Sequence, residues 1–218
     1  MSSDVPRVAS AFRETLKRIL DVVVAGLMLV ILSPIMILIA VMIFIQDGRP
    51  ILFRQQRPGK CGRPFYCLKF RTMRDPRPGQ NRWTTDADRV TGLGRVLRRT
   101  SLDELPELLN VLRGEMSLVG PRPLLMEYLN LYSTEHQRRH DVRPGLTGLA
   151  QISGRRALTL SQRLDLDVDY VRNWTMLGDL GILVRTLAEP FKPGDIEGQE
   201  LADVDDLGFH QLVNSGKK

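Results

Sequence analysis

The dominant pattern in this chain is an uncharged apolar run from Val22 to Ile45, about 24 residues long, with Ser33-Pro34 near its middle. A helix of that length extends roughly 36 Å, which is enough to cross the hydrocarbon core of a bilayer. The run is longer than the apolar part of a secretory signal, and the Ser-Pro pair lies at its middle, not at a cleavage-site end. The pattern therefore predicts a retained membrane element.

Two conformations are possible for this membrane element. Pro34 has no backbone N–H and its ring clashes with an earlier carbonyl, so a helix through it must kink or break, while Ser33 can bond a carbonyl that the proline leaves unpartnered. Basic residues flank the run on both sides: Lys17, Arg18, Arg49, Arg54, Arg57 and Lys60. Because basic residues that flank an apolar run usually stay on the cytoplasmic side of the membrane, both ends of the run are predicted to lie on that side. This predicts a re-entrant helix-break-helix, with a single kinked spanning helix as the alternative. Asp21, at the edge of the run, is expected to pair with Arg18 or Lys17.

The rest of the pattern predicts an α+β fold that is mostly helical, with minor β content. Segments 50–53 and 65–70 predict two short strands joined by a Pro/Gly turn at 57–62. Apolar residues at helical spacing predict helices over 105–112 and within 89–97, 124–139 and 160–171. The polar stretch 75–88 and the glycine-rich stretch 143–154 are predicted to be loops.

Length and charge suggest how these elements are divided. The 218 residues suit a lead-in and re-entrant membrane anchor at 1–48, a compact cytosolic catalytic domain at 49–192 and an acidic tail at 193–218, which we expect to be flexible. The tail has a net charge of −4 and the remainder +10. A basic body favours anionic partners such as lipid headgroups or phosphorylated small molecules. Nucleic acid is disfavoured, because no known binding motif is present.

The adjacent carboxylates Asp103 and Glu104 are the first candidates for chemistry. They precede the predicted helix at 105–112, and two starts are possible: a capping box of Ser101 with Glu104, or Asp103 as N-cap with Pro106 in the first turn. Capping and compensation of the helix dipole alone would explain acids at this place. Nearby arginines instead favour phosphate binding: Arg98 lies just upstream, Arg122 lies between two prolines, and Arg143 precedes Pro144-Gly145.

These residues suit phosphoryl transfer. A helix N-terminus and nearby arginines would keep Asp103 ionised, and an ionised carboxylate can attack phosphorus. Glu104 could hold Mg²⁺, which usually binds one or two carboxylates together with substrate phosphate oxygens. The arginines would stabilise the charge on the transferring group.

Other motifs are weaker. His136 and His140 are four residues apart, but Gln137 replaces the glutamate of the metalloprotease motif. The trio of Asp165, Asp167 and Asp169 begins like a calcium loop but lacks its glycine and its final glutamate, so a solvated helix face is predicted. The Gly92-Leu93-Gly94 segment lacks the third glycine of a dinucleotide-binding loop. Cys61 and Cys67, six residues apart, fit no zinc or redox pattern.

Taken together, the ordered motifs resemble those of the small monotopic polyprenyl-phosphate phosphoglycosyl transferases, also called bacterial sugar transferases. The resemblance covers roughly Phe12–Leu187. The matching motifs are Lys17-Arg18 with Asp21, Ser33-Pro34, Phe70-Arg71-Thr72-Met73, Thr100–Pro106, Ser117–Pro123 and Asp141–Gln151.

The resemblance implies a Mg²⁺-dependent enzyme of the bacterial inner membrane with its catalytic domain on the cytoplasmic face. Such an enzyme transfers a sugar 1-phosphate from a UDP-sugar to a polyprenyl phosphate, most commonly undecaprenyl phosphate, and releases UMP, as the first membrane step of glycoconjugate assembly. It implies that Asp103 is the nucleophile, that Glu104 helps to bind Mg²⁺, that Arg98 and Arg122 contact phosphates, and that Ser33-Pro34 breaks the re-entrant helix. Two alternatives remain: a glycosyltransferase that releases UDP, and a non-catalytic scaffold that binds anionic lipid. Neither the sugar nor the oligomeric state follows from the sequence.

Overall fold

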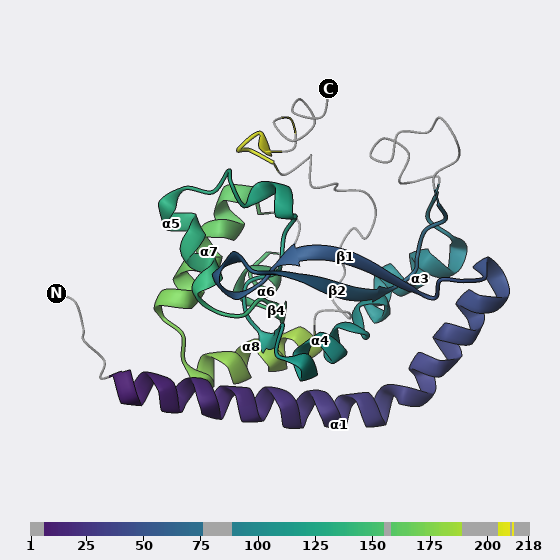
Figure 1. Cartoon of the computed structure of the whole chain (residues 1–218), viewed down its shortest axis with the longest axis horizontal. Helices are drawn as coiled ribbons and strands as arrows, with labels where there is room; N and C mark the ends of the chain where they lie inside the picture. Colours follow the sequence, from purple (N-terminus) through teal and green to yellow (C-terminus); the bar gives the residue numbers. More distant parts are fainter. Residues whose placement is uncertain (1–6, 76–88, 155–157, 189–204, 210, 212–218) are drawn as a thin grey trace.

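The N-terminal helix α1 dominates the architecture. The computed structural model describes residues 7–75, 89–154, 158–188, 205–209 and 211, and α1 runs from Arg7 to Asp47 along one side of the remaining elements (Figure 1). The 36-residue stretch Phe12–Asp47 is long and apolar enough to cross a membrane, and its most apolar 18-residue window has a mean hydropathy of 3.0. Only 11% of its most apolar window is buried against the rest of the protein. Most of the apolar surface of α1 is therefore not covered by the rest of the protein and is suited to contact with lipid.

The predicted break at Ser33-Pro34 is a bend in one continuous helix. Pro34 lies inside α1, which changes direction in its second half (Figure 1). Pro34 cannot donate to the carbonyl of Val30, and the Ser33 hydroxyl donates to that carbonyl instead at 2.8 Å. Because the serine satisfies the oxygen left by the proline, the helix continues where a break was predicted.

The predicted hairpin is confirmed and is longer than expected. Strands β1 (Leu52–Pro58) and β2 (Pro64–Phe70) pair antiparallel, with Leu52 opposite Phe70, around a tight turn at Lys60–Gly62. The polar loop predicted at 75–88 lies outside the described residues except at Asp75.

A second, parallel pair of strands was missed. Strands β3 (Ser117–Val119) and β4 (Gly145–Thr147) pair in parallel, and β4 lies inside the stretch 143–154 that was predicted to be a glycine-rich loop. A side chain at Gly145 would place its Cβ 2.1 Å from the backbone nitrogen of Gly120, so glycine is required for this approach. The region 124–139 is mostly helical, as predicted, but it forms three short helical segments and no continuous helix. They are η3 (Met126–Tyr128), α5 (Thr134–Gln137) and η4 (Arg138–Asp141).

The remaining helices confirm a mostly helical fold with minor β content. They are α3 (Gly92–Thr100), η2 (Leu102–Glu104), α4 (Glu107–Arg113), α6 (Leu149–Ile152), α7 (Leu160–Arg172) and α8 (Met176–Ala188). Two apolar clusters attach α1 to them. In its first half Ala25 joins the core around Leu108 and Val111 of α4, and in its second half Ile39 and Ile43 join Phe70 and Leu97.

Three polar residues near the start of α1 bind three different elements. Lys17 forms an ion pair with Asp179 of α8. Arg18 donates to the carbonyls of Val111 at 2.6 Å and Leu112 at 2.9 Å, at the C-terminal end of α4. The carboxylate of Asp21 accepts from the N–H of Leu118 at 3.1 Å, so the predicted pairing of Asp21 with Lys17 or Arg18 is replaced by a contact to β3. These bonds connect the anchor directly to the body.

Part of the acidic tail packs against the body. Residues 193–204 lie outside the described part of the chain. Further on, Phe209 is buried against Tyr128 and Tyr132, and Asp206 accepts hydrogen bonds from the backbone and side chain of Ser161. These contacts attach this part of the tail to α7 and to the turn η3.

We predict that Arg18→Ala lowers the free energy of unfolding by about 2–3 kcal/mol, because two carbonyls at the end of α4 lose a charged donor. Denaturant unfolding in detergent micelles measures the change. Arg13→Ala, at an exposed position on the same helix, is the matched control and should change stability by less than about 0.5 kcal/mol.

Candidate active site

Asp103 and Glu104 lie on a single tight turn between two helices. Helix α3 ends at Ser101, whose backbone is left-handed with φ 57° and whose N–H bonds back to the carbonyls of Leu97 and Arg98. The turn η2 then holds Asp103 and Glu104, and α4 begins only after Pro106. Both predicted helix starts are therefore wrong, since Ser101 ends the preceding helix and its side chain makes no capping bond.

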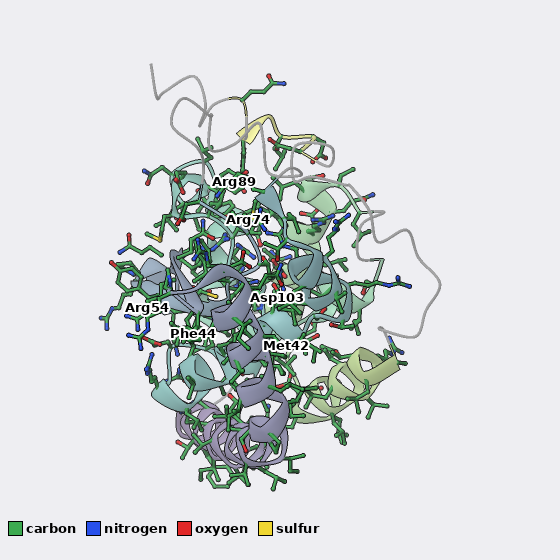
Figure 2. The ribbon with its side chains drawn as sticks, turned by 90° about the vertical axis from the view of Figure 1, so that its right-hand side faces the viewer. Met42, Phe44, Arg54, Arg74, Arg89 and Asp103 are labelled. Carbon is green, nitrogen blue, oxygen red and sulfur yellow. The ribbon has the colours of Figure 1, made fainter. Side chains whose placement is uncertain are left out.

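Apolar neighbours fix this turn on the membrane anchor. Leu102 and Leu105, on either side of the two carboxylates, pack against the cluster that contains Ile39 and Ile43 of α1. In the end-on view Asp103 is seen in the same part of the molecule as Met42 and Phe44 of α1 (Figure 2), which agrees with the packing of Leu102 and Leu105 against this half of the helix. The side chains of Met42 and Phe44 are exposed, at 44% and 51%. The carboxylates are thus held beside an exposed apolar surface.

Glu104 is clamped between two cations. Its carboxylate accepts from Lys69 Nζ at 2.6 Å, from Arg122 Nη1 at 3.3 Å and from Arg122 Nη2. Burial opposes ionisation of Glu104, but the charges of Arg122 and Lys69 outweigh it and hold its pKa well below the usual range. Glu104 is therefore a permanently ionised group with a fixed orientation.

Lys69 was not predicted from the sequence to be a site residue, although its ammonium binds two carboxylates. Its ammonium also lies 3.3 Å from Glu107, which is 3% exposed at its side chain and accepts from the thiol of Cys67. Burial, with the nearby Glu104, raises the pKa of Glu107, and burial with the nearby Glu107 raises the pKa of Cys67 to about 12. A signal existed in the alternation of β2: Phe65 and Cys67 face the core, and Lys69 continues that face.

Asp103 differs from its neighbour in having no partner. It is 9% exposed, and within the described part of the chain no hydrogen bond or ion pair reaches its carboxylate. Burial, reinforced by the negative charge of Glu104, raises the pKa of Asp103 to about 6, against the opposing charges of Lys69, Arg122 and Arg98. The helix-start argument for a strongly ionised Asp103 is thus replaced by a carboxylate that is mostly ionised at neutral pH and unpaired. Such a group is suited to attack an electrophile.

Arg98 lies near Asp103, as the sequence predicted. Its Nε donates to the hydroxyl of Thr72 at 3.0 Å, and its charge lowers the pKa of Asp103. The position of α3 depends on Gly94, since a Cβ there would lie 2.1 Å from the carbonyl oxygen of Thr72. Arg98, one turn later, is therefore aligned with Thr72.

Arg143 is not brought to the carboxylates. Its Nε donates to the carbonyl of Gly114 at 2.9 Å, just after α4, and its charge acts on Arg18. Asp103 precedes α4, so Arg143 lies at the opposite end of that helix. The structure thus assembles Arg98 and Arg122 around Asp103 and places Arg143 at the contact between α4 and the anchor.

The weaker sequence candidates take structural roles. His136 pairs with the exposed Asp165, whereas the buried His140 packs against Tyr132. Asp167 was predicted to be solvated, but it is 4% exposed and bonds to Arg139. Its neighbours in the trio, Asp165 and Asp169, are exposed as predicted.

The carboxylates fit a magnesium ion. Within the described residues no group of three or more histidine, cysteine or acidic side chains is placed to hold a metal. Mg²⁺ does not need such a cage, because it usually takes one or two carboxylates and completes its octahedron with water and phosphate oxygens. The unpaired carboxylate of Asp103 and the adjacent, ionised Glu104 fit that donor set.

Comparison with known proteins identifies the family of this chain. Residues 12–193 match the family model described as "Bacterial sugar transferase". The chain belongs to the bacterial sugar transferase family. It is 48% identical to an uncharacterized sugar transferase, EpsL, of Bacillus subtilis (strain 168) over 79% of this chain and 85% of the relative.

Two further bacterial sugar transferases carry more specific names. The chain is 46% identical to the UDP-glucose:undecaprenyl-phosphate glucose-1-phosphate transferase of Caulobacter vibrioides, over 84% of this chain and 71% of the relative. It is 40% identical to the undecaprenyl-phosphate galactose phosphotransferase of Salmonella typhimurium, over 78% of this chain and 39% of that longer protein.

We predict that Lys69→Met lowers the free energy of unfolding by about 3–5 kcal/mol, because Glu107 is left buried without its cation. Glu107→Gln in the same chain should recover most of the loss, since a neutral amide needs no counter-charge. Denaturant unfolding of the single and double variants makes the comparison. Equal stability of Lys69→Met and the parent would contradict a buried Lys69–Glu107 pair.

Proposed function

We propose that this bacterial sugar transferase transfers a sugar 1-phosphate from a UDP-sugar to a polyprenyl phosphate, undecaprenyl phosphate in bacteria, and releases UMP. The observation that carries the proposal is the contrast between the two carboxylates: Glu104 is fixed by two cations, whereas the buried Asp103 is unpaired. The names of the relatives support the reaction class, because those transferases act between UDP-glucose, or a galactose phosphate donor, and undecaprenyl phosphate.

In the first step Asp103 acts as the nucleophile. One carboxylate oxygen attacks the β-phosphorus of the UDP-sugar, the bond from that phosphorus to the bridging oxygen breaks, and UMP leaves with the bridging oxygen. The sugar phosphate is then bound to Asp103 as an acyl phosphate. Arg98 and Arg122 lie where they can stabilise negative charge on the phosphoryl oxygens.

In the second step an oxygen of the lipid phosphate attacks the same phosphorus and displaces the carboxylate of Asp103. The products are the polyprenyl diphosphate sugar and the free enzyme. Asp103 and Glu104 would hold Mg²⁺, which would neutralise phosphate charge when it is bound. Glu104 keeps its orientation through Lys69 and Arg122 throughout.

The arrangement of α1 supports a re-entrant anchor in the bacterial inner membrane. Near its start Lys17 and Arg18 bind the body, and at its end Asp47 pairs with Arg74. A crossing helix would separate its ends by about 30 Å of hydrocarbon, which is incompatible with both ends binding one polar body. Both ends, and the catalytic domain, then lie on the cytoplasmic face, where UDP-sugars are available.

A second apolar surface supports the same orientation. Helix α8 exposes four large apolar side chains at helical spacing, and its Asp179 binds Lys17 of α1, so the two helices lie side by side (Figure 1). The exposed residues are Leu177, Leu180, Val184 and Leu187. An amphipathic helix with such a face lies in the membrane interface. The lipid phosphate, whose charged head stays at that depth, would then meet Asp103 beside the exposed second half of α1.

We predict that purified protein with Mg²⁺, polyprenyl phosphate and a panel of UDP-sugars releases UMP with at least one donor, and that Asp103→Asn lowers the rate by at least about 10⁴-fold because the nucleophile is lost. Nucleotide chromatography identifies the product. Release of UDP would favour a glycosyltransferase, and an Asp103→Asn variant that keeps its biological activity would favour a scaffold.

Trapping distinguishes the roles of the two carboxylates. With UDP-sugar and no lipid acceptor, peptide mass spectrometry should find a phosphosugar adduct on Asp103. Asp103→Asn is the matched control, since it removes the proposed nucleophile, leaves Glu104 in place and should give no adduct. An adduct on Glu104 would reverse the assignment.

We predict that at low Mg²⁺ concentration the rate of UMP release falls about tenfold per pH unit below pH 6, because the metal-free site raises the pKa of Asp103 to about 6 and leaves it protonated and non-nucleophilic there. Saturating Mg²⁺ should move this acidic limb to lower pH, because a bound cation favours the ionised carboxylate. Arg98→Gln removes a charge that lowers this pKa, so the acidic limb should move to higher pH. Arg99→Gln, at the next and exposed position, should leave the limb in place. A rate independent of pH from 5 to 8 would contradict this role for Asp103.

We predict that both ends of α1 are accessible from the cytoplasm only. Arg13→Cys and Arg49→Cys, in a Cys61→Ser background that removes the exposed native thiol, provide one label site before and one after the apolar run. A membrane-impermeant maleimide should label neither site in intact spheroplasts and both after permeabilisation. Labelling of position 13 from the outside would establish a spanning helix instead.

A further inference from the structure

A buried ion pair lies behind Arg122, away from the carboxylates. Arg139, at the start of η4, is 1% exposed at its side chain, and Asp167 of α7 is 5% exposed. The carboxylate of Asp167 accepts from Arg139 Nη2 at 2.6 Å and from Nε at 3.1 Å. Neither residue has a role in the reaction proposed above. A fully buried charge pair costs desolvation energy and is seldom kept for stability alone.

The third contact of Arg139 connects this pair to the site. Its Nη2 also donates to the backbone carbonyl of Arg122 at 2.7 Å, and its Nη1 donates to the hydroxyl of Tyr132 at 3.2 Å. The guanidinium lies over the Tyr132 ring, 5.5 Å from the ring centre. Asp167 and Tyr132 therefore orient Arg139 so that one N–H points at the Arg122 backbone.

The local sequence explains why this carbonyl contact matters. In Pro121-Arg122-Pro123 two of the three residues have no backbone N–H, so the segment is held through its carbonyl oxygens. The carbonyl of Pro121 accepts from the N–H of Gly145 at 3.0 Å, and that of Arg122 accepts from Arg139. These two bonds fix the backbone from which the Arg122 side chain reaches Glu104.

We propose that Arg139 and Asp167 are positioning residues that hold the Arg122 backbone, and through it the Arg122–Glu104 contact beside Asp103. The proposal rests on the proposed function in so far as the transfer reaction is its readout. Arginine is required at position 139, because three partners in different directions need several donors on one rigid plane. A lysine has one compact ammonium and cannot bind all three in that geometry.

A double-mutant cycle tests the proposal. Asp167→Asn in the parent chain should lower kcat/KM for UMP release on the order of 10–100-fold, the usual effect of misplacing a group through its supporting contacts. In an Arg122→Gln background the side chain that Asp167 is proposed to position is already absent, so Asp167→Asn should lower kcat/KM by less than about twofold. An equal loss in both backgrounds would show that Asp167 does not act through Arg122 and would overturn the proposal.

Matched variants exclude a general loss of folding. Asp165→Asn makes the same charge change two residues earlier on α7, where the side chain is 71% exposed, and should leave kcat/KM within about twofold of the parent. Tyr132→Phe keeps the ion pair and removes one bond to Arg139, so it should give a smaller loss, about threefold. If Asp167→Asn does not fold, Tyr132→Phe takes its place in the cycle, and additivity with Arg122→Gln overturns the proposal there as well.

A measurement without turnover separates this proposal from the proposed function. Hydrogen–deuterium exchange of the peptides that contain Glu104 and Arg122 should increase in Asp167→Asn or Tyr132→Phe and stay unchanged in Asp165→Asn. If the parent releases no UMP, the proposed function fails while the exchange result still decides the positioning. Unchanged exchange at both peptides in Asp167→Asn would overturn the positioning, whatever the activity.

Discussion

The clamp of Glu104 between Lys69 and Arg122 is the contact on which the site depends. It joins three segments: the end of β2, the turn before α4 and the Pro-Arg-Pro segment after β3. Two carboxylates side by side in a buried turn repel each other, and that repulsion alone would favour protonation of one of them. Because both cations bind Glu104, this residue stays ionised. Asp103 keeps an unpaired carboxylate, and its pKa is raised to about 6.

The same turn is attached to the anchor through apolar contacts. Leu102 and Leu105 belong to the cluster that Ile39 and Ile43 of α1 complete. The position of Asp103 relative to α1 is therefore set by side-chain packing, without a flexible linker between them. At the other end of α4, Arg18 of α1 binds the last carbonyls. A reaction between a water-soluble donor and a lipid acceptor requires such a fixed position, because the acceptor phosphate cannot leave the interface.

Charged groups in this protein mostly connect segments that are distant in sequence. Lys17 binds Asp179, and Arg139 binds Asp167 and the Arg122 backbone. Each pair is largely withdrawn from water, so removing one partner leaves the other without its counter-charge. Such pairs add little net stability but specify one arrangement of elements. The body contains short strands and one-turn helices with few regular hydrogen bonds, and these pairs fix their relative positions.

The sequence by itself determined the apolar anchor, the hairpin, the mostly helical class and the grouping of Arg98 and Arg122 with Asp103 and Glu104, because these are expressed in composition, local periodicity and residues near in sequence. Several features depended on contacts between distant segments. Periodicity could not show that Lys69 reaches Glu104, that Asp167 faces inward to Arg139, or that Arg143 binds the far end of α4. The Ser33 hydroxyl decided between a bend and a break, since it satisfies the carbonyl that Pro34 leaves free. The short parallel strands β3 and β4 were hidden for the same reason: glycines that indicate a loop locally permit close backbone approach in the fold.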